Sequence, residues 1–122
     1  MHKLPNLDTK KFKFIQAGVN DFGTLASVFL QYRFDYVFHN AAEVGVQRTL
    51  ENPLLVLNDI EGIKNILKLS SYSKVKRVYF SSSSEVYGAP IVFPQNENTT
   101  PLNSKLPYSI VKNLGEAYFK SY

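Results

Sequence analysis

The feature that most constrains the fold is an alternation of short apolar runs with longer segments of helical periodicity. Three runs are typical of buried strands: residues 12–19 (FKFIQAGV), 35–42 (DYVFHNAA) and 76–82 (KRVYFSS). Near-continuous apolar runs of this length suit strands that are covered on both faces of a parallel sheet. The sequence therefore predicts an α/β fold with three strands and flanking helices.

Segments with helical spacing lie between and after these runs. Asp21 is the expected N-cap of a helix over residues 22–32, and Pro53 suits the first turn of a helix over residues 53–71. A final helix is predicted over residues 108–122. The helix over 53–71 has a broad apolar stripe, which fits burial against both the sheet and a second chain, or burial of one face with a few aliphatic residues exposed.

A long segment, residues 83–107, separates the third predicted strand from the final helix. It holds four of the six prolines and a polar Asn/Thr cluster, so the sequence predicts a loop with little regular structure. Loops of this length inside a compact domain usually have a function.

Composition weighs against several kinds of site. The chain has no cysteine and two histidines, which excludes disulfides and thiolate sites and predicts no metal centre. The net charge is +4, but the basic residues are scattered, so we expect no nucleic-acid partner. The longest aliphatic run, residues 54–57, is far too short for a bilayer helix. These features predict a cytoplasmic protein with no membrane partner.

A tyrosine and a lysine stand four residues apart at the start of the final helix. This spacing places the phenol of Tyr108 and the ammonium of Lys112 on one helix face. A nearby ammonium stabilises a phenolate, so such a tyrosine can act as a base closer to neutral pH. The spacing alone is not specific, because Tyr72 and Lys76 repeat it.

The segment before Tyr108 distinguishes the two pairs. Tyr108 follows a predicted strand that ends in four consecutive serines, residues 81–84, whereas Tyr72 closes a helix. Ligands of open parallel sheets bind outside the carboxyl ends of the strands. Ser83 is therefore expected to meet Tyr108 over a substrate hydroxyl. The alternative is a serine-rich turn that caps its own backbone.

Four stretches together resemble the extended short-chain dehydrogenase/reductase family, specifically its nucleotide-sugar epimerases, dehydratases and decarboxylases. They are HNAA at 39–42, AAEVGVQRTLENP at 41–53, RVYFSSSSEVYG at 77–88 and PYSIVK at 107–112. The likeness extends over residues 12–122 and looks most like sugar-nucleotide 4-epimerases, uronate epimerases included. It implies a Rossmann-type doubly wound parallel sheet, NAD as cofactor, a nucleotide-diphosphate sugar as substrate, and a homodimer of the full-length protein.

The resemblance also implies roles for individual residues. Tyr108 would take the sugar hydroxyl proton while hydride leaves the same carbon, Lys112 would bind the nicotinamide ribose, and Ser83 would bind the reacting hydroxyl and relay its proton. Ser84 would join them in holding substrate. Glu85 matches a glutamate that acts as an acid or base in dehydratases and decarboxylases, while epimerases more often have a neutral residue there. A solvated loop carboxylate is the alternative.

Cofactor contacts are implied at several further positions. Small side chains in the turn after the second predicted strand would let the dinucleotide approach the backbone. Gly18 stands where the family usually has an acidic residue against adenine, and Asp59 stands where it usually has an asparagine. The implied contacts are Gly18, Val19, Asn40, Ala41, Ala42, Glu43, Asp59, Ser81, Tyr108 and Lys112.

The chain departs from the family in two further ways. It has no glycine-rich G-x-x-G-x-x-G turn to hold the pyrophosphate, and no substrate region after the tyrosine helix. In the strand order 3-2-1-4-5 the predicted strands would be the third, fourth and fifth, so the run over 12–19 would have no neighbour to pair with. We therefore expect residues 1–122 to be a partial NAD-binding domain, either a piece of a longer enzyme or the product of an interrupted gene, that is inactive on its own.

The expected function is that of an NAD-dependent nucleotide-sugar epimerase acting through a 4-keto sugar. The alternatives are a nucleotide-sugar 4,6-dehydratase or uronate decarboxylase of the same family, or a non-catalytic remnant that only associates with other chains.

Overall fold

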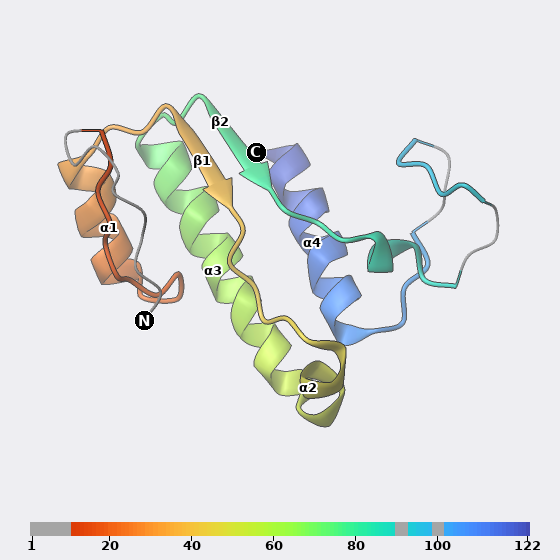
Figure 1. Cartoon of the computed structure of the whole chain (residues 1–122). Coiled ribbons are helices and arrows are strands. Elements are labelled where there is room, and N and C mark those ends of the chain that lie inside the picture. The colour runs from red at the N-terminus through yellow and green to blue at the C-terminus, as the bar shows by residue number, and fades with distance from the viewer. Residues whose placement is uncertain (1–10, 90–92, 99–101) are drawn as a thin grey trace.

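The computed structural model describes residues 11–89, 93–98 and 102–122. Its elements follow the order α1 (Phe22–Gln31), β1 (Tyr36–His39), α2 (Val46–Glu51), α3 (Pro53–Tyr72), β2 (Arg77–Phe80), the short 3-10 helix η1 (Ser84–Tyr87) and α4 (Pro107–Ser121). Figure 1 shows α3 and α4 lying behind the two strands, α1 beside α3, and α2 at the far end of α3. The arrangement is a partial α/β fold of the Rossmann type.

The sheet consists of β1 and β2, which run parallel and pair from Tyr36 with Arg77 to His39 with Phe80. Alternate side chains point to opposite faces of a strand. Val37 and Val78 face the helices, where they pack against a cluster formed by Phe29, Ile66 and Leu69.

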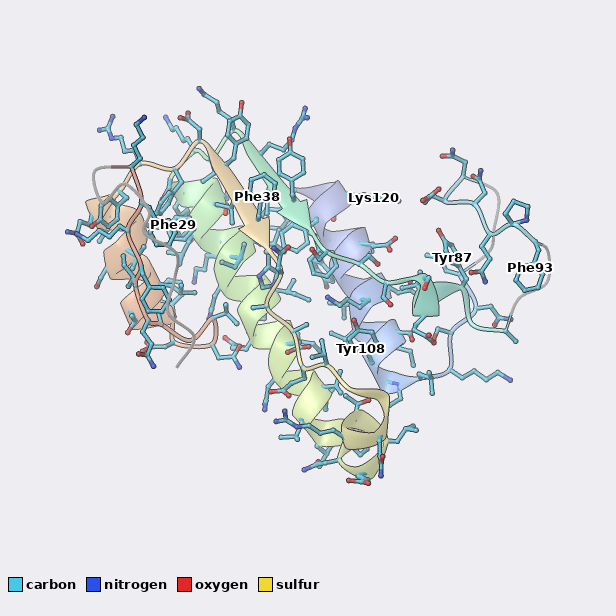
Figure 2. All side chains as sticks on the ribbon, viewed as in Figure 1. Phe29, Phe38, Tyr87, Phe93, Tyr108 and Lys120 are labelled. Carbon is cyan, nitrogen blue, oxygen red and sulfur yellow. The ribbon has the colours of Figure 1, made fainter. Side chains whose placement is uncertain are left out.

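The outer face of the sheet is aromatic and exposed. It presents Tyr36, Phe38 and Tyr79, and Figure 2 labels Phe38 on this face. The rings of Phe38 and Tyr79 stack with their centroids 4.6 Å apart.

A second cluster lies between α3 and α4. Val56, Ile63 and Leu67 of α3 pack with Val111 of α4, and Phe80 and Tyr108 pack at its border. This cluster fixes the start of α4 against the middle of α3 and against the end of β2. It therefore holds the segment that contains Tyr108 and Lys112.

The predicted strand over 12–19 is wrong. Residues 12–18 form no regular element and pair with no strand among the described residues, and only Val19 of this stretch is half-buried. Val19 docks on α3 instead: its carbonyl accepts a hydrogen bond of 2.9 Å from Asn65 Nδ2, and its side chain lies against Gly62. The physical reason is the one that the doubly wound order anticipates, namely that no neighbouring strand lies beside this run.

The predicted helices are confirmed to within one residue at each end. Asp21 caps α1 by accepting a hydrogen bond from Thr24 N at 3.0 Å. Pro53 and Pro107 lie in the first turns of α3 and α4. Two elements were missed, α2 and η1, and η1 lies inside the segment predicted to be a loop. In the parts of the chain that the structure describes, no helix is both long and apolar enough to cross a bilayer.

Candidate active site

The first turns of α4 place Tyr108 and Lys112 side by side, as their spacing predicts. The Lys112 ammonium lies 5.7 Å from the centroid of the Tyr108 ring and 4.9 Å from that of Phe80. Its Nζ also donates a hydrogen bond of 2.6 Å to the carbonyl of Ser81, directly after β2. This bond ties the tyrosine helix to the carboxyl end of the sheet.

The Tyr72 and Lys76 pair does not form such a group. Lys76 makes an ion pair of 2.8 Å with Asp35, and the Tyr72 side chain is 72% exposed. The spacing therefore produces a buried lysine beside a half-buried tyrosine only where the lysine also meets the end of β2.

Lys112 is 5% exposed, which is unusual for a lysine. Burial lowers the pKa of its ammonium, and the Asp59 carboxylate on α3 opposes this by raising it. Burial likewise raises the pKa of Asp59, while the hydrogen bond from Glu43 and the charge of Lys112 lower it. The two groups thus stabilise each other's charged forms.

The turn after β1 closes over these two charges. The backbone N–H of Glu43 donates to both carboxylate oxygens of Asp59, at 3.1 and 2.9 Å. Ala41 and Ala42 line a narrow cleft together with Asp59 and Lys112. Glu43 also makes an ion pair of 3.2 Å with Arg48 of α2.

Asn40 connects the same turn to the end of β2, because its Oδ1 accepts a hydrogen bond from Ser81 Oγ. The structure therefore brings together eight of the residues predicted to contact the cofactor, namely Asn40, Ala41, Ala42, Glu43, Asp59, Ser81, Tyr108 and Lys112.

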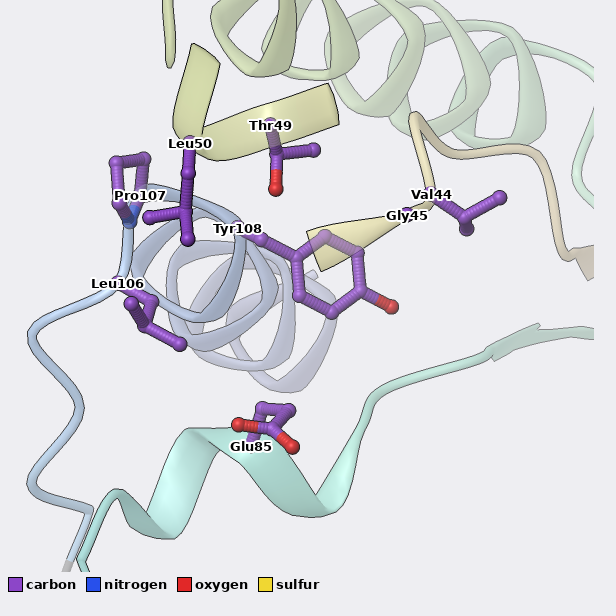
Figure 3. A pocket seen from close by; sticks show the side chains of 8 residues that line it. All are labelled: Val44, Gly45, Thr49, Leu50, Glu85, Leu106, Pro107 and Tyr108. Carbon is purple, nitrogen blue, oxygen red and sulfur yellow. The ribbon is translucent and has the colours of Figure 1, made fainter. Parts of the chain in front are cut away.

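A pocket of about 230 Å³ lies beside Tyr108. Figure 3 shows the Tyr108 ring extending into it, with the Glu85 carboxylate of η1 on the side away from α2. The other lining residues are Val44, Gly45, Thr49, Leu50, Leu106 and Pro107. Mostly apolar walls with a few polar groups are typical of small-molecule sites.

The serines after β2 have separate contacts. Ser82 Oγ donates to the Glu116 carboxylate of α4. Ser83 is the N-cap of η1 and accepts a hydrogen bond of 3.3 Å from Glu85 N. Ser84 begins η1 and is exposed. Among the described residues Ser83 and Tyr108 are not hydrogen-bonded to each other, so the capping alternative is realised and the substrate role of Ser83 stays a prediction.

Among the described contacts, Gly18 and Val19 have none with the turn after β1 or with Lys112. The Gly18 carbonyl accepts a hydrogen bond from Asp21 N at 3.1 Å, and Val19 packs on α3. No hydrogen bond in the described ranges joins either residue to the turn after β1, and their contact with the cofactor stays a prediction.

Sequence reasoning missed α2 and Glu116. Thr49 and Leu50 of α2 line the Tyr108 pocket, and Glu116 holds Ser82. A signal for Glu116 was present, because it follows Lys112 by four residues and so shares a face of α4 with Tyr108 and Lys112. The six residues of α2 are too few to show helical periodicity.

The residues present fit the part of NAD that contains the nicotinamide ribose. Ala41 and Ala42 have small side chains that would let a dinucleotide approach the backbone, and the Lys112 ammonium is a hydrogen-bond donor suited to ribose hydroxyls. The sequence contains no glycine-rich turn that would receive the pyrophosphate of a dinucleotide.

Several proteins that are similar to the chain in sequence and fold are nucleotide-sugar 4-epimerases. Over its full length the chain is 29% identical to a UDP-glucose 4-epimerase of Mycolicibacterium smegmatis, of which it covers 38%. It is 32% identical to a UDP-glucuronate 4-epimerase of Thermodesulfobacterium geofontis, with 93% of this chain and 35% of that protein aligned. The chain thus spans about a third of the length of these relatives.

Solved structures agree with these relatives. The crystal structure of UDP-glucose 4-epimerase from Bifidobacterium longum in complex with NAD+ and UDP superposes with a TM-score of 0.82 at 28% identity, covering 88% of this chain and 32% of that one. The family model for GDP-mannose 4,6 dehydratase matches residues 1–122. The match covers the whole sequence and confirms the resemblance to nucleotide-sugar epimerases and dehydratases: the chain belongs to the GDP-mannose 4,6 dehydratase family.

Proposed function

We propose that this chain contains the catalytic set of an NAD-dependent nucleotide-sugar 4-epimerase, with Ser83, Tyr108 and Lys112 as its members. The observation that supports this most is the buried Lys112 ammonium, which lies 5.7 Å from the centroid of the Tyr108 ring beside a pocket. The cofactor is NAD, which solved structures similar to this chain contain. When bound, NAD supplies an acceptor for hydride.

The chain's own residues move the proton. Tyr108 takes the proton of the sugar 4-hydroxyl, and the neighbouring Lys112 ammonium stabilises the phenolate that accepts it. Ser83 holds the same hydroxyl, and Ser84 adds a contact to the substrate. After the 4-keto sugar has turned in the pocket, Tyr108 gives its proton to the keto oxygen while the hydride returns to the same carbon on its other face.

The apolar walls of the pocket suit this cycle. A keto sugar must present each face in turn, and walls without many fixed hydrogen-bond partners hold a ring loosely. Of the residues that line the pocket, Val44, Leu50 and Leu106 provide such a surface, and Thr49 and Glu85 are the polar exceptions.

Glu85 supports a second candidate function. Its carboxylate faces the pocket that also holds Tyr108 (Figure 3), where a carboxylate can serve as an acid or base. A 4,6-dehydratase or a uronate decarboxylase requires such a group, and the family model that matches the chain bears a dehydratase name. A non-catalytic remnant is less well supported. Burial of the Lys112 ammonium lowers the stability of the fold, and in a remnant this loss would have no functional benefit.

The full-length protein is proposed to be a homodimer. Leu54 and Leu57 on α3 and Ile110 and Tyr118 on α4 remain more than half exposed, which leaves apolar surface for a partner copy. A single copy of the full-length protein in light scattering would contradict this assembly. A cytoplasmic location stays a prediction.

The experiment that tests the function is product analysis by mass. The protein that contains this chain is incubated with NAD and with several UDP- and GDP-linked sugars. The products are separated by chromatography, and their molecular masses are measured by mass spectrometry. Epimerisation leaves the mass unchanged, dehydration removes water, and decarboxylation removes carbon dioxide. Absence of any product with all donors would reject both enzymatic candidates.

A further inference from the structure

Among the residues that the structure describes, the charge of Lys112 has no direct counter-ion. Within the described parts of the chain its ammonium contacts the Ser81 carbonyl and two aromatic rings, but no carboxylate lies at ion-pair distance. The ion pairs found there are Arg48–Glu43, Lys64–Glu61 and Lys76–Asp35. Burial disfavours an ammonium, so the charge state of Lys112 depends on the anions near it.

Asp59 is the anion placed to act on this lysine. It lines the same narrow cleft as Lys112, and the Glu43 N–H fixes both of its carboxylate oxygens. The carboxylate raises the pKa of Lys112 and the ammonium lowers the pKa of Asp59, so the two charges act on each other across the cleft.

We propose that Asp59 is a positioning residue that keeps Lys112 in its ammonium form during the reaction of Tyr108. An asparagine at this place could still accept the Glu43 N–H through its amide oxygen, but it would have no charge. The inference rests on the proposed function, and it assigns to the negative charge of Asp59 a task separate from contact with the cofactor.

The other charged groups around the cleft are accounted for. His39 of β1 is buried, and its pKa is lowered by that burial and by Lys112, so it adds no second positive charge at neutral pH. The Glu43 carboxylate is paired with Arg48. Two further carboxylates in the described part of the site have other partners or surroundings: Glu85 faces the Tyr108 pocket, and Glu116 accepts a hydrogen bond from Ser82.

The direct test is the titration of Lys112 by NMR of lysine side-chain carbons. Asp59→Asn is expected to lower the pKa of Lys112, because the carboxylate that stabilises its ammonium is gone. The matched control is Asp35→Asn, which removes a carboxylate that is paired with the exposed Lys76. A Lys112 pKa that falls no further in Asp59→Asn than in the control, or that rises, overturns the proposal.

A reciprocal measurement covers the case in which Asp59→Asn does not fold. Coupling between two sites is mutual, so Lys112→Met must raise the pKa of Asp59, measured by carboxyl-carbon NMR. Where both variants fold, the two shifts must agree in size and be opposite in sign. An Asp59 pKa that is unchanged in Lys112→Met contradicts the proposal independently of the first variant.

Activity adds a third readout. Catalysis needs the ammonium, so turnover is lost as pH rises through the pKa of Lys112. The alkaline limb of the kcat/KM profile is therefore expected at lower pH in Asp59→Asn, and Asp59→Glu is expected to move it part of the way back. An alkaline limb that stays at the same pH in Asp59→Asn contradicts the positioning role of Asp59. Absence of turnover in the unaltered protein rejects the proposed function but does not affect the NMR result.

Discussion

Gly115 of α4 lies directly against the ring of Phe80 at the end of β2. A Cβ added at Gly115 would lie no more than 3.1 Å from three carbons of the Phe80 ring, which is closer than van der Waals distance. The closeness of helix and strand here lets Lys112, one turn earlier, reach the Ser81 carbonyl. A side chain at residue 115 must therefore displace either α4 or Phe80.

The first prediction tests this contact. Gly115→Ala is expected to lower the free energy of unfolding by about 1–3 kcal/mol, because the cost of overpacking exceeds the helix propensity that alanine gains. The matched control is Gly18→Ala, where an added Cβ meets no atom within 4 Å. Urea titrations of the two variants should differ, and equal midpoints would show that α4 can shift freely.

The second prediction concerns the proposed base. Tyr108→Phe is expected to lower turnover by about 10²–10⁴-fold, the range for loss of a general base, while NAD binding is largely kept. Tyr72→Phe is the control, since Tyr72 has the same spacing to a lysine but is exposed at the end of α3. Single-turnover kinetics and equilibrium dialysis of NAD measure the two properties. Full activity of Tyr108→Phe would reject the assignment.

The third prediction separates the two candidate reactions. If the reaction is epimerisation, Glu85→Gln should leave turnover largely intact, because the amide keeps the shape of the pocket wall. If it is dehydration or decarboxylation, the same change should lower turnover by about 10²-fold or more. Mass analysis of the products during the same time courses identifies which reaction is being compared.

The fourth prediction follows from His39. Burial and Lys112 hold the pKa of this imidazole below its usual value near 6.5. The unfolded chain therefore binds a proton more readily, and the free energy of unfolding should fall as pH drops through about 6.5 toward the lower folded value. His39→Phe keeps a ring that stacks on Phe80 and contacts Phe119, and this ring cannot be protonated.

Denaturant unfolding between pH 8 and 5 measures this effect. The difference in stability between His39→Phe and the unaltered chain should grow as the solution becomes more acidic. A difference that stays constant over this range would mean that His39 does not contribute to acid sensitivity.

Local patterns in the sequence predicted most of the helices and the two paired strands. Asp21, Pro53 and Pro107 mark helix starts through their own backbone chemistry, so they are readable without the rest of the fold. The run over 12–19 has the composition of a strand, but a strand also needs a neighbour for its hydrogen bonds, and that requirement is not local.

The candidate site was predictable only in part for a similar reason. The spacing of Tyr108 and Lys112 determines that they share a helix face, and the structure confirms this. The contacts of Lys112 with Ser81 and of Glu116 with Ser82 join residues more than 30 positions apart. Such contacts depend on the crossover from β2 to α4, which no periodicity encodes.

The hydroxyl of Ser83 shows how one side chain can serve two purposes. As the cap of η1 it accepts a hydrogen bond from Glu85 N, which occupies a single lone pair. A serine hydroxyl has a second lone pair and one proton, and neither is consumed by this contact. Ser83 can therefore cap η1 and still donate a hydrogen bond to another group.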